Sequence, residues 1–160
     1  MDTIGDKKIF MEEAIKLAQS NVENNNGGPF GAVVVKDGKI VGRGKNKVTS
    51  SNDPTAHAEI VAIREAAQNL GTFNLQGCEI YASCEPCPMC LGAIYWARFD
   101  KLYYAGTKDD AAKADFDDSM IYKELCIPKE KRSLPSAQLM RDKAVNVFEA
   151  WINSEKKVPY

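Results

Sequence analysis

Residues 78–105 read CEIYASCEPCPMCLGAIYWARFDKLYYA, and the fold class is predicted from this stretch. Two β-rich runs, Cys78–Ser83 and Lys101–Ala105, flank a segment that starts at Pro86 and carries Leu91 and Ile94 at helical spacing. Strands that are joined by a crossover helix lie parallel in a sheet. We therefore expect two parallel strands with a helix packed against them.

A hairpin precedes this stretch. Phe30–Val35 and Lys39–Gly44 are β-rich runs on either side of Asp37-Gly38, a pair suited to a two-residue turn with positive φ. Antiparallel strands followed by parallel ones form a mixed sheet. The pattern predicts an α/β sandwich whose active site lies where strands end and helices start.

Helices are expected on both sides of the hairpin. The first covers residues 8–24, and the second opens at Asp53-Pro54 and closes at Leu70-Gly71. Residues 107–124 are acidic and predict short helical pieces, and 127–135 predict a connecting loop. A terminal amphipathic helix is indicated by apolar residues at helical spacing, which are Val145, Phe148, Trp151 and Ile152.

Composition restricts the class of protein. The 160 residues, 44% of them hydrophobic, fit a single domain over 1–160 that needs no disulfides. Charged N-terminal residues and the lack of a long apolar run predict a cytoplasmic chain with no membrane span, whose five cysteines are free or metal-bound. A net charge of −1 and a pI of about 5.9 argue against nucleic-acid binding.

One histidine occurs in the whole chain, in Thr55-Ala56-His57-Ala58-Glu59. Thirty positions later (87 minus 57) comes Pro86-Cys87-Pro88-Met89-Cys90. His-x-Glu followed by Pro-Cys-x-x-Cys is the signature of zinc deaminases. We therefore predict one Zn²⁺ per chain, held by His57, Cys87 and Cys90.

The spacing of these residues suits a catalytic metal. Cys87 and Cys90 are three apart at a predicted helix start, where both sulfurs reach one ion and the helix N-terminus favours thiolates. His57 and Glu59 converge only if they lie at a helix end. Two thiolates and an imidazole leave the fourth position open for water, and Glu59 is the expected catalytic acid–base group.

A structural zinc site is the alternative. Cys84, Cys87 and Cys90 form Cys-x-x-Cys-x-x-Cys, and with His57 they would close a Cys₃His cage that does no chemistry. Such a protein would be a zinc-stabilised interaction module. Cys78 and Cys126 are expected to be small buried hydrophobes.

The chain resembles the cytidine deaminase superfamily, and within it the bacterial guanine deaminases. The likeness covers nearly the whole chain, and its motifs are Gly28–Gly38, Asn52–Glu59, Ser83–Arg98 and Phe116–Ser119. Membership implies a three-layer α/β/α sandwich around a mixed sheet. The segment from Ser133 to Met140 departs from the family pattern.

The resemblance also implies residue roles and a reaction. The expected reaction is hydrolysis of guanine to xanthine and ammonia, with Asp118 as a second catalytic group beside Glu59. Phe30 would stack on the purine and Asn46 would hydrogen-bond it. The full set of implied substrate-binding residues is Phe30, Asn46, Ala58, Trp96, Asp118 and Tyr160.

The resemblance further implies a homodimer in which the C-terminal tail, residues 127–160, is exchanged so that Tyr160 completes a partner's pocket. The loop from Ile127 to Pro135 would be the hinge. Guanosine deaminase is the nearest alternative activity, followed by tRNA adenosine deaminase. The zinc motifs are shared by all three and do not select the substrate.

Overall fold

The computed structural model describes residues 4–160 in two compact units, one that ends at Asp118 and one over Ser119–Tyr160. The first unit contains a four-stranded sheet of order β2-β1-β3-β4. Its strands are β1 (Gly31–Lys36), β2 (Lys39–Lys45), β3 (Cys78–Cys84) and β4 (Lys101–Gly106). β1 is antiparallel to β2 and β3, whereas β3 and β4 are parallel, which confirms the predicted mixed sheet.

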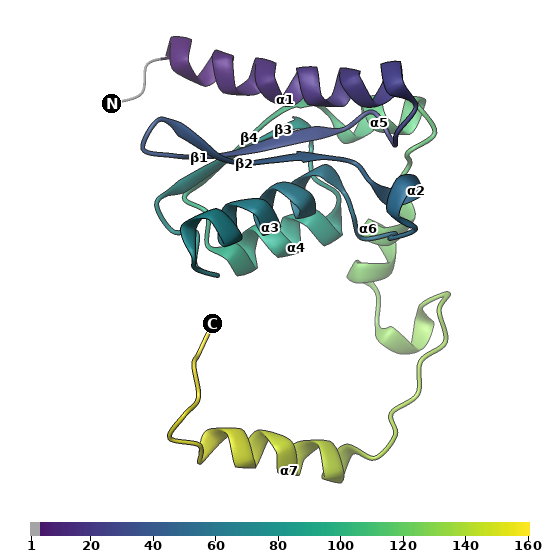
Figure 1. Ribbon diagram of the computed structural model, residues 1–160. Helices are drawn as coiled ribbons and strands as arrows, with labels where there is room; N and C mark the ends of the chain where they lie inside the picture. Colours follow the sequence, from purple (N-terminus) through teal and green to yellow (C-terminus); the bar gives the residue numbers. More distant parts are fainter. Residues whose placement is uncertain (1–3) are drawn as a thin grey trace. The chain divides into compact units, whose positions relative to one another are not determined.

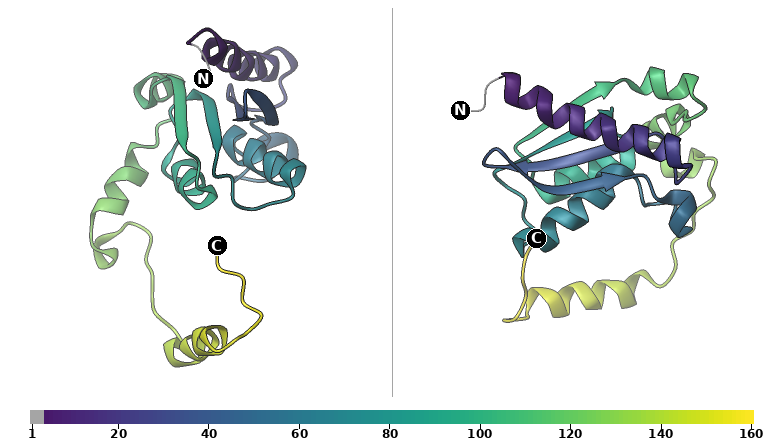
Figure 2. Two further views of the ribbon diagram at one scale, coloured as in Figure 1. Left: turned by 90° about the vertical axis from the view of Figure 1, so that its left-hand side faces the viewer. Right: turned by 45° about the horizontal axis from the view of Figure 1, so that its top comes forward.

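The sheet is covered on both faces. Helix α1 (Ile4–Asn24) lies over one face, and α3 (Ala58–Leu70) with α4 (Pro88–Ala97) lies under the other, as Figures 1 and 2 show. Short helices α2 (Val48–Ser51) and α5 (Lys108–Lys113) complete the unit. The three-layer α/β/α arrangement is therefore confirmed.

Strand β1 shows how the two faces form the core. Ala32 and Val34 belong to the apolar cluster that includes the buried residues of α3 and α4, whereas Val33 and Val35 pack with Phe10 of α1. All four are at most 2% exposed. An uninterrupted apolar strand is what a sheet covered on both faces requires.

The predicted hairpin turn is confirmed, since Asp37 and Gly38 have φ of 49° and 70°. The predicted start of α3 is wrong. The helix begins at Ala58 and not at Asp53-Pro54, and His57 is its extended N-cap residue with φ −66° and ψ 157°. Likewise α4 begins at Pro88 with Cys87 as its N-cap residue, two positions after the expected start.

Helix α3 lies unusually close to β2. A Cβ atom added at Gly44 would lie 2.0 Å from the carbonyl oxygen of Ala58 and 2.6 Å from the backbone nitrogen of Ala62. Only a residue without a side chain allows this approach. Gly44 therefore helps to place the first turn of α3, where His57 and Glu59 are attached.

The second unit contains α6 (Ser119–Cys126), a 3₁₀ turn (Lys129–Lys131) and α7 (Arg141–Ile152). The terminal helix and the connecting loop are thus confirmed. None of these three elements has a buried residue, and Cys126 is exposed, so the expectation that Cys126 is buried is wrong. Across the described residues, no helix combines the length and apolar character that crossing a membrane requires.

We expect Gly44→Ala to lower the free energy of unfolding by about 3 kcal/mol, because the new methyl group overlaps the backbone of α3. Gly92→Ala is the matched control, since nothing lies within 4 Å of the added Cβ. That change in mid-α4 should raise stability by up to about 1 kcal/mol. Urea unfolding measures both; equal effects would contradict the close packing of α3 on β2.

Candidate metal and active site

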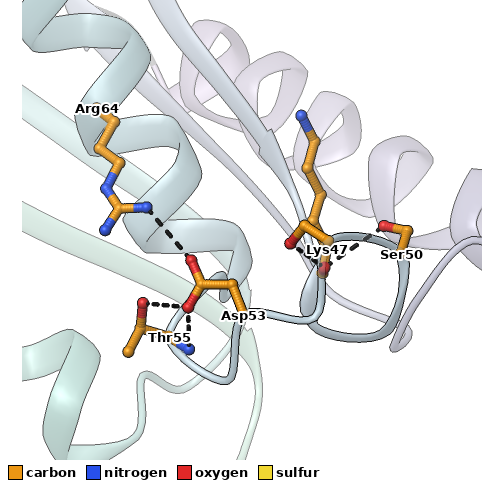
Figure 3. A network of polar contacts seen from close by, with 6 residues as sticks. Lys47, Ser50, Asp53, Thr55 and Arg64 are labelled. Carbon is orange, nitrogen blue, oxygen red and sulfur yellow. Dashed lines mark hydrogen bonds and ion pairs between the residues drawn. The ribbon is translucent and has the colours of Figure 1, made fainter.

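The loop before α3 fixes the position of His57. The Asp53 Oδ1 atom accepts hydrogen bonds from the Thr55 backbone N–H at 2.8 Å and from the Thr55 hydroxyl at 2.7 Å (Figure 3). These bonds lower the pKa of Asp53. Arg64 of α3 lies 3.7 Å from the other carboxylate oxygen. The Asp53–Arg64 ion pair therefore connects the turn that precedes His57 to helix α3.

Two cysteine sulfur atoms lie next to the His57 ring. Cys87 and Cys90 lie at the start of α4, just after β3, and each Sγ atom is 3.5 Å from His57 Nδ1. Zn–N bonds of about 2.0–2.1 Å and Zn–S bonds of about 2.3 Å at a tetrahedral angle place N and S about 3.6 Å apart. The three donors, all within 4.8 Å of one another, therefore fit zinc.

The protonation of these groups also fits a cation site. A hydrogen bond from Cys90, and a second from His57, lower the pKa of Cys87 to about 4. The hydrogen bond with Cys87 raises the pKa of His57. A Cys87 group that readily becomes a thiolate beside the imidazole is suited to binding a cation.

Cys84 takes no part in this group. Among the described residues the set that can hold a metal is His57, Cys87 and Cys90. The Cys84 thiol instead donates to the Thr107 carbonyl at 3.6 Å, and burial raises its pKa to about 11. The closed Cys₃His cage is therefore not formed. Three protein ligands leave a fourth position open, as in catalytic zinc sites.

Glu59 is the second residue of α3 and is only 8% exposed. Its carboxylate is in hydrogen-bonding contact with Cys90, and burial raises its pKa. His57 is extended and Glu59 is helical, so the two side chains reach one point although they are two residues apart. A buried carboxylate beside an open metal position is suited to proton transfer.

Asp118 is the last residue of the first unit. Burial, the negative charge of Cys87 and the charge of Asp117 raise its pKa. Its carboxylate is therefore within electrostatic reach of the metal ligands. This position suits the predicted second catalytic group, a role that stays a prediction.

A backbone hydrogen bond joins Phe30 and Asn46. The Asn46 N–H donates to the Phe30 carbonyl at 3.2 Å, and Asn46 is 7% exposed. The Asn46 Oδ1 atom accepts from the backbone N–H groups of Gly28 at 3.3 Å and Val48 at 3.1 Å. The Asn46 oxygen thus accepts two backbone hydrogen bonds, whereas its amide NH₂ group has no hydrogen-bond partner among the described residues.

The other predicted substrate residues lie in different surroundings. Ala58 is buried at the first position of α3. Trp96 of α4 is 65% exposed. Tyr160 belongs to the second unit and is 72% exposed. Their contacts with substrate stay predictions.

Phe116 belongs to the Phe116–Ser119 motif but is not among the predicted site residues. Its ring packs edge-on against Phe30, with centroids 4.9 Å apart and planes at 85°. It stands two residues before Asp118. The sequence feature that could have indicated this contact is an aromatic residue within the acidic segment 107–124.

Comparison with known families confirms what this geometry indicates. Residues 5–106 match the model of the cytidine and deoxycytidylate deaminase zinc-binding region. The chain belongs to this family. As in its other members, the residues of this deaminase domain fit zinc.

Individual relatives match more than nine-tenths of the chain. A guanine deaminase from Bacillus subtilis is 53% identical over 96% of this chain and 98% of its own length. A crystal structure of guanine deaminase from that organism superposes with a TM-score of 0.93, at 52% identity over 96% of this chain and 98% of that one. A tRNA-specific adenosine deaminase from Buchnera aphidicola is 34% identical over 92% of this chain and 94% of its own length.

We expect Cys90→Ser to weaken zinc binding by at least about 100-fold, because it removes a thiolate ligand. Cys84→Ser is the matched control and should keep one zinc ion per chain, since its thiol faces the Thr107 carbonyl. Zinc content after dialysis against a competing chelator measures both. Loss of zinc from Cys84→Ser would instead indicate that Cys84 is a fourth zinc ligand in a closed Cys₃His site.

Proposed function

We propose that this protein hydrolyses guanine to xanthine and ammonia. The observation that carries the proposal is the open His57–Cys87–Cys90 site with buried Glu59 beside it. The similarity to the Bacillus subtilis guanine deaminase over nearly the full length of both chains supports guanine as the base. Similarity to the tRNA-specific adenosine deaminase is lower, at 34% identity.

When zinc is bound, it supplies an activated water molecule as the nucleophile. Glu59, which is buried next to the Cys90 thiol, would be the group that moves a proton from the nucleophile to a ring nitrogen of the purine. Burial raises the pKa of Glu59, which favours its acting as a proton acceptor and donor. Asp118, whose pKa burial also raises, would supply the second proton with which the amine departs as ammonia.

The purine is bound by residues of the first unit. Phe30 supplies an aromatic face, and the free amino group of Asn46 donates to an acceptor on the ring. Ala58 contributes through its backbone: the first helical bond of α3 runs from Val61 N–H to the His57 carbonyl, so the N–H of Ala58 has no partner in the helix. Trp96 limits the space beside the base.

The subunit arrangement we propose is a homodimer with exchanged tails. The helices of the second unit have no buried residue, yet they carry many apolar side chains. Such a surface needs a partner to cover it. The exposed apolar residues of α6 and α7 are Met120, Ile121, Leu125, Val147, Phe148, Trp151 and Ile152. Tyr160 would then close the partner's pocket.

A cytoplasmic location is part of the same proposal. The described cysteines are all free thiols, and a thiolate metal site is suited to a reducing compartment.

Ammonia release across guanine, guanosine, adenine, adenosine, cytosine, cytidine and tRNA tests the reaction. Guanine should be turned over fastest, whereas activity confined to adenosine in tRNA would overturn the proposal.

Glu59→Gln should keep its zinc and lose about 10³-fold in kcat, because the side chain no longer transfers protons. A Glu59→Gln enzyme with unchanged kcat would remove Glu59 from the mechanism.

Tail exchange is tested by mixing two inactive chains, Glu59→Gln and a chain that lacks Tyr160. If the tail completes the partner's site, half of the dimers are mixed and each has one complete site, so about a quarter of wild-type activity returns. If each tail serves its own subunit, no activity returns. Size-exclusion chromatography verifies that both chains form dimers.

A further inference from the structure

Asn21, near the end of α1, is a polar side chain that is only 1% exposed. Its amide nitrogen donates to two backbone carbonyls, that of Gly28 at 3.0 Å and that of Asn46 at 2.8 Å. An amide NH₂ group has two protons, so both are used. The side chain therefore joins two segments that lie 18 positions apart (46 minus 28).

These two segments carry the predicted purine-binding residues. The Phe30 N–H donates to the Gly28 carbonyl at 2.8 Å, and the Asn46 N–H donates to the Phe30 carbonyl at 3.2 Å. The Gly28 N–H donates to Asn46 Oδ1 at 3.3 Å. Asn21 thus holds the backbones from which the Phe30 ring and the Asn46 amide extend.

The Asn46 carbonyl has little room to move. A Cβ atom added at Gly27 would lie 2.3 Å from this carbonyl oxygen and 3.2 Å from the Asn21 amide nitrogen. The carbonyl is therefore enclosed between the Gly27 backbone and the Asn21 side chain. A side chain at Gly27 would push the Asn46 carbonyl aside by steric overlap, whereas loss of the Asn21 amide would remove its hydrogen-bond donor. Both changes therefore displace the same carbonyl.

We propose that Asn21 is a positioning residue for the purine, which keeps Phe30 and Asn46 at the mutual spacing that the ring requires. The inference rests on the proposed function, since it takes these two residues as purine contacts. Asn21 itself acts through the carbonyls of Gly28 and Asn46. It belongs to α1, whereas the metal ligands start α3 and α4.

This role has a distinct kinetic signature. Contacts to the purine ring are made in the ground state and in the transition state alike, so loosening them raises KM and leaves kcat nearly unchanged. A purely structural role lowers the fraction of folded enzyme, which reduces apparent kcat and leaves KM unchanged. The split between KM and kcat therefore separates the two roles.

The test compares zinc-loaded Asn21→Ala and Gly27→Ala with two controls. Asn24→Ala is matched in residue type and helix, because the exposed Asn24 side chain donates to the Ser20 carbonyl of the same helix at 2.8 Å. Val35→Ala is matched for loss of stability, since Val35 is 2% exposed near the hairpin end of β1.

Asn21→Ala and Gly27→Ala should each raise KM for guanine about tenfold with kcat within about threefold, and both controls should keep the wild-type KM. Zinc content should equal that of the wild type in all four. A KM within twofold of wild type in Asn21→Ala, or an equal rise in Val35→Ala, would overturn the assignment.

Amide hydrogen exchange separates this inference from the proposed function. If the wild-type enzyme releases no ammonia from guanine, the proposed function fails, but the exchange rates still report on Asn21. The N–H groups of Phe30 and Asn46 should exchange faster in Asn21→Ala than in Asn24→Ala. Unchanged exchange at both would show that Asn21 does not hold these segments.

Discussion

The site depends on the convergence of two helix starts. Helices α3 and α4 begin at Ala58 and Pro88. The N-cap residue of α3, His57, has its Nδ1 atom 3.5 Å from the sulfurs of Cys87, the N-cap residue of α4, and of Cys90 in its first turn. Both helices pack on one face of the sheet. A shift of either helix would separate the three donor atoms, so the close packing of α3 at Gly44 and the geometry for binding zinc depend on each other.

Electrostatics divides the work among the acidic groups. Burial raises the pKa values of both Glu59 and Asp118, and each lies near the thiolates. Glu59 is almost fully buried at the metal, whereas Asp118 ends the first unit at partial exposure. In the proposed reaction, Glu59 would transfer the proton at the nucleophile and Asp118 would assist the leaving amine.

The predicted purine-binding residues are held differently from the metal ligands. Metal ligands are held by helix starts, whereas Phe30 and Asn46 extend from irregular backbone just before β1 and just after β2. Such backbone needs side-chain hydrogen bonds to stay in place, and Asn21 supplies two of them. The second unit differs from the first because the apolar side chains of α6 and α7 are not buried in a core.

The sequence by itself determined the strands, the hairpin turn, the terminal helix and the zinc ligands, because these follow from local periodicity and a specific spacing. It misplaced the start of α3, since the Asp53 turn holds Thr55 and prevents the helix from starting there. Only tertiary structure decided that Cys84 turns to Thr107, that Phe116 packs on Phe30 and that Asn21 joins two loops. Each of these contacts links residues that are far apart in the chain, and no local pattern encodes such a pairing.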